Sequence, residues 1–327
     1  MPRGDEQYSV GRSGDLVRLA DAANRTVVSL ITSVGNVAFE MKVHGQHLLH
    51  WPYATIEEFK ARPALSGIPL LAPWANRLDE QAFYANGIRH ALDPRITGTP
   101  PIHGFLSYTD QWRLVEATAN DASAWVTSVL EFESQPAWMA QFPFPHNIQM
   151  THRLQEGVLE VRTTITNCGD EPMPVAIGFH PYLRLTDCSR NEWTISVPAR
   201  TRWLLSPLRL PTGETEPVEQ LWQTGTTALK DRDLDDVFGD LDRDSRGCAT
   251  VALKGRRQQI EVILGPNWKS LVIYSPPTGA DFVCVEPMAG ITNGMNLAQR
   301  GIYKEQQYIS PGGRWEASFW IRPSGFN

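Results

Sequence analysis

The sequence predicts an all-β fold, a large single-domain antiparallel β-sandwich spanning residues 1–327, with residues 1 to about 12 as a disordered tail. Three observations predict it. Many short segments alternate apolar and polar residues, as half-buried strands do. No segment shows a long helical period or a repeat of solenoid length. The 24 prolines and 11 tryptophans favour loops, strand edges and aromatic surfaces, and no shift in composition marks a linker between domains.

The first half of the chain is expected to open with a β-meander. The expected elements are a weakly alternating stretch at 17–40 with its clearest strand at 27–31, a turn at Gly35-Asn36, a strand at 37–43 and a single helical turn at 56–60. Three helix breakers within the apolar run 67–77 predict a buried, shaped loop instead of a helix. Residues 91–101 are rich in Pro, Gly and Thr and are expected to be loop, followed by paired strands at 112–115 and 124–132.

The second half contains the clearest hairpin of the chain, in which residues 148–154 turn through Glu156-Gly157 into residues 159–166. Its second strand places Leu159, Val161, Thr163 and Ile165 on one face. Residues 142–145 and 205–224 are expected to be irregular, because prolines interrupt them. Further strands are expected at 193–197, 260–264, 271–274, 282–286 and 315–321.

Composition and charge exclude several classes of protein. Hydrophobic residues make up 42% and charged residues 20%, as in a soluble globular protein with a large core. The formal net charge of −6 gives no electrostatic reason to bind nucleic acid or an anionic membrane, so a neutral polar ligand is the expected partner. The sequence shows no apolar run of membrane-spanning length and no signal-peptide core near Met1. The oligomeric state is left open.

Metal, disulfide and nucleotide sites are not expected. His44, His47 and His50 suggest a metal site, but a strand sends alternate residues to opposite faces and a helix groups only two of the three. No nucleotide-binding loop, H-E-x-x-H or G-x-S-x-G motif occurs. The scattered cysteines predict reduced thiols in a cytoplasmic protein. These cysteines are Cys168, Cys188, Cys248 and Cys284.

Residues 178–182 are the centre of the candidate site. Pro181 pushes the residue before it toward extended backbone, so His180 is expected at the stiff end of a strand. Its ring is expected to lie between Phe179 and Tyr182. Residues 283–287 repeat the same design of an extended run, an ionisable residue and a proline, and the ionisable residue there is Glu286.

Three more ionisable residues stand beside rigidifying neighbours at loop or strand ends: Arg77, His103 and Asp235. Taken singly, each has an ordinary interpretation as a surface or core residue. Together with His180 and Glu286 they supply a carboxylate and an imidazole, which can remove a proton from one oxygen while delivering a proton to another. Neighbouring aromatic side chains can stack against the apolar face of a sugar ring.

These residues together resemble the aldose 1-epimerase (galactose mutarotase-like) family. Five segments in the family's order carry the resemblance: P-x-x-N-R at 73–77, H-G at 103–104, H-P-Y-[FL] at 180–183, D-x-x-F at 235–238 and E-P at 286–287. The D-x-x-F spacing favours Asp235 over the adjacent Asp236. The stretch between Arg77 and His103 has few of the glycines and asparagines of galactose-type members, so the identity of the aldose is left open.

The resemblance implies a fold, a reaction and residue roles. The fold is the family's large β-sandwich, and the reaction interconverts the α and β anomers of a free aldose without a metal or cofactor. Glu286 would be the base for the anomeric hydroxyl and His180 the acid for the ring oxygen. His103 and Arg77 would hold hydroxyls and polarise the reacting oxygens. The other expected substrate-binding residues are Asn76, Asp235, Tyr182 and Trp74.

Three alternative functions stay open. A hexose-6-phosphate 1-epimerase on the same fold would need a basic cluster for the phosphate, and Arg256-Arg257 in an expected hairpin turn is the only adjacent basic pair. A non-catalytic sugar-binding protein on the same scaffold would be expected to lack His180 or Glu286, and both are present. A polysaccharide lyase or hydrolase on a related β-sandwich would be expected to have a longer substrate groove and a secretion signal.

Overall fold

The computed structural model describes residues 7–222, 225–276 and 280–327. Its strand ladders are antiparallel, and no described helix is longer than six residues. The helices are α1 (Ile56–Ala61), α2 (Pro94–Thr97), α3 (Pro136–Met139), α4 (Val218–Leu221) and α5 (Gly294–Gln299), with 3₁₀ turns η1 (Phe132–Ser134) and η2 (Arg190–Glu192). The predicted all-β antiparallel fold is confirmed.

Three large sheets carry the fold. The five-stranded sheet has the order β1 (Tyr8–Ser13), β2 (Leu16–Asp21), β3 (Thr26–Ile31), β4 (Val37–Val43) and β5 (Gln46–His47). The nine-stranded sheet has the order β19 (Thr226–Ala228), β16 (Thr194–Ser196), β21 (Ala249–Lys254), β22 (Gln259–Leu264), β26 (Arg314–Ser324), β12 (Val158–Asn167), β11 (His146–Gln155), β10 (Ala124–Glu131) and β9 (Arg113–Ala119).

The eight-stranded sheet positions the candidate site. It has the order β18 (Pro211–Pro217), β17 (Ala199–Leu205), β20 (Leu234–Leu241), β23 (Ser270–Ser275), β24 (Val283–Met288), β14 (Gly178–Phe179) and β6 (Leu70–Leu71), with β15 (Tyr182–Leu183) also paired to β24. Two short ribbons complete the fold: β13 (Met173–Val175) with β25 (Gln307–Ile309), and β7 (Ala82–Ala85) with β8 (Ile88–Ala91).

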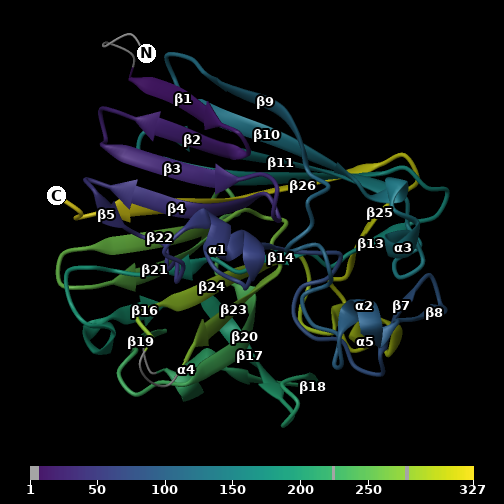
Figure 1. Ribbon diagram of the computed structural model, residues 1–327. Helices are drawn as coiled ribbons and strands as arrows, with labels where there is room; N and C mark the ends of the chain where they lie inside the picture. Colours follow the sequence, from purple (N-terminus) through teal and green to yellow (C-terminus); the bar gives the residue numbers. More distant parts are fainter. Residues whose placement is uncertain (1–6, 223–224, 277–279) are drawn as a thin grey trace.

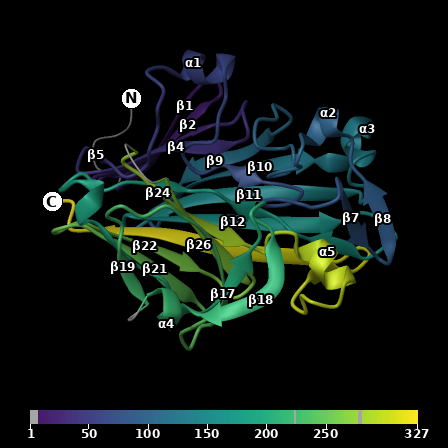
Figure 2. The same ribbon diagram turned by 90° about the horizontal axis from the view of Figure 1, so that it is seen from below.

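The long nine-stranded sheet forms one layer, and the other two large sheets lie against it (Figures 1 and 2). Phe179 of β14 packs on Phe319 of β26 with ring centroids 5.0 Å apart, which joins the eight-stranded and nine-stranded sheets. Leu19 of β2 belongs to the same buried cluster. Burying large apolar side chains between facing sheets is the main favourable term for this arrangement.

Most expected elements are confirmed, because the residue pattern within each segment is enough to specify its structure. β11 and β12 pair as the predicted hairpin, with Leu154 opposite Leu159. The expected irregular stretch 205–224 is wrong in part, because it contains β18 and α4, while residues 223–224 lie outside the described residues. Prolines begin and end β18, which is compatible with its place at the sheet edge.

The N-terminal tail is shorter than predicted. Tyr8–Ser13 forms β1 and pairs along its whole length with β2, so only residues 1–6 of the expected tail lie outside the described residues. The β7–β8 ribbon lies in a stretch for which no strand was predicted. In the described part of the chain, no helix combines the length and the apolar character that crossing a membrane requires.

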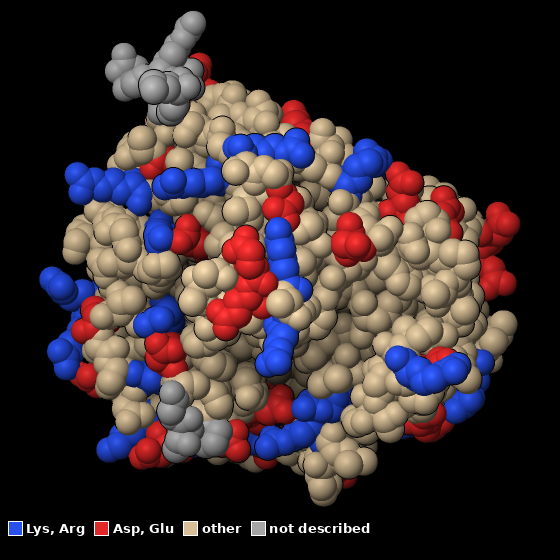
Figure 3. All heavy atoms as spheres, viewed as in Figure 1, with Lys and Arg blue, Asp and Glu red and all other residues tan. Residues whose placement is uncertain are grey.

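The molecular surface carries charges of both signs. On the face in Figure 3, acidic and basic side chains are interspersed, and no large area of this face is covered by one sign. Arg256 lies in the turn between β21 and β22, as predicted, and its guanidinium binds Glu192 at 2.5 Å. The adjacent basic pair therefore does not contribute a free cationic cluster.

Candidate active site

Strand alternation brings Glu286 and Asp235 to one face of the eight-stranded sheet. Glu286 is paired with Val272 across β23–β24, and Asp235 is paired with Tyr274 across β20–β23. Residues two apart in a strand share a face, so Asp235, Tyr274 and Glu286 point to the same side. Asp236 points to the other side and binds Arg202 at 2.9 Å. The preference for Asp235 over Asp236 thus agrees with the strand geometry.

His180 contacts Glu286 directly. Its Nε2 lies 3.1 Å from Oε1 of Glu286, and both side chains are almost completely buried. The backbone N–H of His180 donates to the carbonyl of Pro69, which ties the segment after β14 to the buried loop before β6. The ring of Tyr182 stacks on the imidazole, with centroids 4.6 Å apart and planes 16° apart.

The expected position of the His180 ring between Phe179 and Tyr182 is half right. Phe179 is adjacent in the strand and therefore points to the opposite face, where it packs on Trp268 and Phe319. The second neighbour of the imidazole is His103, whose ring stands edge-on at 5.5 Å.

His103 is held by Asn76 through two reciprocal contacts. The Asn76 N–H donates to Nδ1 of His103 at 3.2 Å, and the His103 N–H donates to the Asn76 carbonyl at 2.9 Å. Both residues have positive φ, at 62° for His103 and 57° for Asn76. A neutral imidazole that accepts at Nδ1 carries its proton on Nε2. His103 is therefore a hydrogen-bond donor.

Arg77 connects this loop to Asp235. Its Nη1 lies 3.5 Å from Oδ2 of Asp235, and the Oδ1 atom of Asn76 accepts from both the N–H and Nη1 of Arg77 at 2.8 and 3.1 Å. A second cation, Arg209, lies with Nε 4.0 Å from Oδ2 of Asp235. Sequence reasoning missed Arg209, which stands in an exposed turn without any local signal.

These residues line one pocket of about 320 Å³. Seven of the eight predicted site residues lie there, although they are up to 210 positions apart in the sequence. Three further lining residues, Leu65, Ile102 and Tyr274, were not predicted. The predicted residues in the pocket are Asn76, Arg77, His103, His180, Tyr182, Asp235 and Glu286.

Trp74 is the exception and must be corrected. It is 1% exposed and does not line this pocket. Its ring packs on Phe105 and Phe83, with centroids 5.8 and 6.5 Å away. Trp74 is therefore a packing residue beneath the loop. Phe238, the last residue of the D-x-x-F segment, is likewise fully buried, against Trp222.

Burial sets the charge of the acid–base pair. It raises the pKa of Glu286 well above its ordinary value, and nearby Asp235 adds to this effect while Arg77 opposes it. Burial also lowers the pKa of His180 well below its ordinary value. Both directions favour uncharged side chains, so the pair shares one proton between Oε1 of Glu286 and Nε2 of His180. The pKa of His103 is lowered to about 3 by burial and by Arg77, so His103 is neutral near pH 7.

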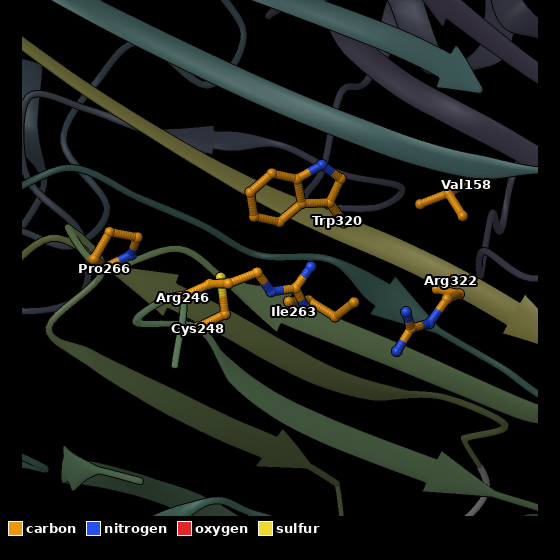
Figure 4. A pocket seen from close by; sticks show the side chains of 7 residues that line it. All are labelled: Val158, Arg246, Cys248, Ile263, Pro266, Trp320 and Arg322. Atoms are coloured by element: carbon orange, nitrogen blue, oxygen red, sulfur yellow. The ribbon is translucent and has the colours of Figure 1, made fainter. Parts of the chain in front are cut away.

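A larger hollow, of about 460 Å³, lies on the outer face of the nine-stranded sheet (Figure 4). Trp320 and Ile263 face each other across β22 and β26 at its floor. Its two arginines are already paired, Arg246 with Asp244 at 3.1 Å and Arg322 with Glu261 at 2.6 Å. It holds no carboxylate–imidazole pair, so we place the candidate active site in the smaller pocket.

The described residues contain no group of three or more His, Cys, Asp or Glu side chains arranged to hold a metal ion. This applies to His44, His47 and His50, which stand around β5. All four cysteines are free thiols. The ionisable groups that line the pocket are two carboxyl groups, two imidazoles, two phenols and a guanidinium.

Known proteins share the fold of this chain. The family model described as aldose 1-epimerase matches residues 15–322. A galactose mutarotase-like protein from Clostridium acetobutylicum is 20% identical, with a TM-score of 0.85 over 99% of this chain and 100% of that chain. A galactose 1-epimerase from Lactobacillus acidophilus is 16% identical, with a TM-score of 0.74 over 97% and 98%. An aldose epimerase homologue from C. elegans is 16% identical, with a TM-score of 0.72 over 92% and 96%.

Proposed function

The chain belongs to the aldose 1-epimerase family, and from this premise we propose that it interconverts the α and β anomers of a free aldose. One observation carries the proposal: a buried carboxyl group and a buried imidazole meet at 3.1 Å in a pocket of sugar-sized dimensions. Opening a sugar ring requires removal of one proton and delivery of another at two neighbouring oxygens. A pair that holds one proton supplies both steps.

The reaction balances without an added reagent. Glu286 takes the proton from the anomeric hydroxyl as the C1–O5 bond breaks, and His180 gives a proton to O5. The products of this step are the open-chain aldehyde, a protonated Glu286 and a neutral His180. Rotation about C1–C2 presents the other face of the carbonyl. The reverse transfers then close the ring as the other anomer and restore the pair.

The Glu286–His180 contact explains how the pair reaches its working state. Burial favours a proton on Glu286, whereas the reaction starts from a proton on His180. The two states differ by one proton transfer along the 3.1 Å contact.

The remaining lining residues hold the sugar. His103 offers its Nε2–H to a sugar oxygen, and Arg77 offers its guanidinium. Asp235 offers carboxylate oxygens to ring hydroxyls, and Asn76 fixes the loop from which His103 and Arg77 reach the pocket. Tyr182 keeps the imidazole in one orientation by stacking on it.

Polarimetry of freshly dissolved α-anomers across a panel of aldoses tests the proposal. The purified protein should bring glucose, galactose or a related aldose to anomeric equilibrium faster than a matched sample without protein. Binding of an aldose without any acceleration would favour the non-catalytic sugar-binding alternative.

The phosphorylated alternative is tested with glucose 6-phosphate, whose anomers exchange at equilibrium and are followed by exchange NMR. Among the described residues, Arg77 and Arg209 are the cations beside the pocket, and both lie close to the Asp235 carboxylate, which would repel a phosphate held there. We therefore expect faster exchange for the free aldose than for the phosphate. Preference for the phosphate would assign the protein to the hexose-6-phosphate reaction.

A further inference from the structure

The backbone of Arg77 is hydrogen-bonded at both of its polar groups. Its N–H donates to Oδ1 of Asn76 at 2.8 Å, and its carbonyl accepts from the N–H of Asn293 at 3.0 Å. The side chain of Asn293 reaches the same loop, because its Oδ1 accepts from the N–H of Asp79 at 3.2 Å. Asn293 therefore holds residues 76–79, which we call the Arg77 loop, at two successive points of the backbone.

The local structure fixes the amide of Asn293 in place. Asn293 is 1% exposed and has a φ of 60°, in a left-handed region that asparagine adopts more readily than most residues. Asn296, which is equally buried in α5, donates Nδ2 to Oδ1 of Asn293 at 2.8 Å and to Oδ1 of Asp79 at 2.6 Å. The amide oxygen of Asn293 thus receives two donors and faces the Arg77 loop.

Asn293 is also linked through the chain to the proposed base. Residues 287–292 connect Glu286 of β24 to Asn293, and all of them are buried. One short, packed connection therefore has Glu286 at its start and the contact with the Arg77 loop at its end. Asn293 does not line the pocket that contains Glu286 and His180, which we call the catalytic pocket. It can therefore reach a bound sugar only through Arg77.

The guanidinium of Arg77 depends on this support. It stands at the end of a long side chain, with Nη1 3.1 Å from Oδ1 of Asn76 and 3.5 Å from Oδ2 of Asp235. The second contact is at the limit of a hydrogen bond, so a small shift of the Arg77 backbone would break it. The hydrogen bonds that Arg77 offers to a sugar are equally sensitive to its position.

We propose that Asn293 is a positioning residue for Arg77 and thereby sets the affinity of the catalytic pocket for its sugar. This rests on the proposed function, in which Arg77 holds the sugar in both the ground state and the transition state. A loss of such uniform binding raises KM and leaves kcat nearly unchanged. A purely structural role of Asn293 would lower the stability of the protein without changing KM.

Asn293→Gly tests the proposal. Glycine keeps the left-handed backbone and the N–H that binds the Arg77 carbonyl, and it removes the Oδ1 that binds Asp79. KM for glucose and galactose should rise about three- to tenfold, the range for loss of one hydrogen bond, with kcat changed less than about twofold. Calorimetric titration of the same sugars should show a matching loss of affinity.

Asn36→Gly is the matched control. Asn36 is also 1% exposed, has a φ of 51° and accepts at Oδ1 from Oγ of Ser128 at 3.1 Å, but it lies outside the catalytic pocket and the Arg77 loop. Chemical denaturation should show that both variants fold, whereas only Asn293→Gly should change KM and affinity. The proposal is overturned if Asn293→Gly leaves KM and affinity at wild-type values, or if Asn36→Gly changes them equally.

A double-mutant cycle shows whether Asn293 acts through Arg77. Arg77→Ala alone should raise KM, and adding Asn293→Gly should raise it no further, because the side chain that Asn293 positions is gone. Multiplication of the two separate fold-changes would overturn the proposal. A wild type that binds aldoses without mutarotation would reject the proposed function, and the same cycle on calorimetric affinities would still decide the role of Asn293.

Discussion

At the scale of single residues, burial determines how Glu286 and His180 share a proton. Each side chain is less than a tenth exposed, and each is favoured in its uncharged form. Oε2 of Glu286 has no hydrogen-bond partner among the described residues. An unpaired buried carboxyl oxygen costs stability, and a sugar hydroxyl can satisfy it. The pair is thus prepared for a ligand at a cost to the free protein.

The pH dependence of kcat/KM follows from these directions. Activity requires one proton on the pair. A second proton binds as pH falls through the pKa of His180, which lies well below its ordinary 6.5. The remaining proton leaves as pH rises through the pKa of Glu286, which lies well above 4.5. We expect a bell-shaped profile whose acid limb lies well below pH 6.5. An acid limb centred at or above pH 6.5 would contradict this assignment.

The two sugar-holding side chains should act mainly on binding. Arg77→Ala and Asp235→Ala remove contacts made in both the ground state and the transition state, so steady-state kinetics should show a raised KM with kcat changed little. Arg256→Ala, a surface arginine outside the pocket, is the control and should change neither. A large fall in kcat with KM unchanged for Asp235→Ala would give Asp235 a role in the chemistry.

The sequence identifies ionisable site residues better than it identifies aromatic ones. Seven predicted residues line the pocket. Pro181 restricts the backbone beside His180, and Gly104 permits the positive φ and close approach beside His103. An aromatic residue serves equally well in a core and in a sugar site, so Trp74 was misplaced. Tyr274 was missed because it ends an ordinary core strand, and only the pairing with Asp235 brings it to the pocket.

At the scale of elements, two loops cross to form the wall that carries His103 and Arg77. Ala72 and Gly104 form an isolated bridge, and Phe105 donates its N–H to the Ala72 carbonyl at 3.0 Å. Gly104 has φ of 63°, and a side chain there would collide with that carbonyl. Glycine is therefore required by both its backbone angle and the close approach.

Gly104→Ala should destabilise the protein by about 2–4 kcal/mol, through a positive φ and a backbone clash. It should also lower activity, because it displaces the adjacent His103. Gly14→Ala is the matched control: its φ of 61° is similar, and a side chain there meets open space. The control should cost only about 1 kcal/mol, the lower limit for a left-handed residue, and keep activity. Chemical denaturation measures the free energy of unfolding of both variants. Equal losses of stability would contradict the expected clash between a side chain at residue 104 and the Ala72 carbonyl.

Strands are predicted correctly where their own alternation of apolar and polar residues specifies them. They are missed where only packing against neighbouring elements specifies them. The β11–β12 hairpin alternates cleanly, so its register is predictable. β18 has little apolar alternation and is held by pairing with β17. The β7–β8 ribbon is likewise defined by its pairing and by the packing of α5 against β7. Such elements gain their stability from neighbours that the local sequence does not reveal.

At the scale of the whole molecule, one core joins the three large sheets. The largest buried cluster includes side chains from all of them, and a smaller cluster contains Val272, the cross-strand neighbour of Glu286. Asp235 and Glu286 sit on strands, whereas Arg77 and His103 sit on loops packed over those strands. The geometry of the catalytic pocket therefore depends on how the three sheets and the loops over them pack together.

We propose, as the sequence predicts, that the chain is a single folding domain. Thermal unfolding followed by calorimetry, tryptophan fluorescence and loss of activity should show one coincident transition. The physical reason is the shared core, which leaves no sheet able to bury its inner face alone. Two well-separated calorimetric transitions, with activity lost in the first, would instead indicate independent units.

The most direct test of the central claim is mutarotation of glucose and galactose by folded Glu286→Gln protein, beside the wild type and a sample without protein. The substitution keeps the shape of the side chain and removes the proton acceptor, so kcat should fall at least a hundredfold, within the roughly 10²–10⁴ range of general acid–base catalysis. His180→Asn should lose a similar amount, and the double variant little more, because the two groups act as a unit. Near-wild-type rates for folded Glu286→Gln would remove Glu286 from the chemistry and leave a sugar-binding protein as the better account.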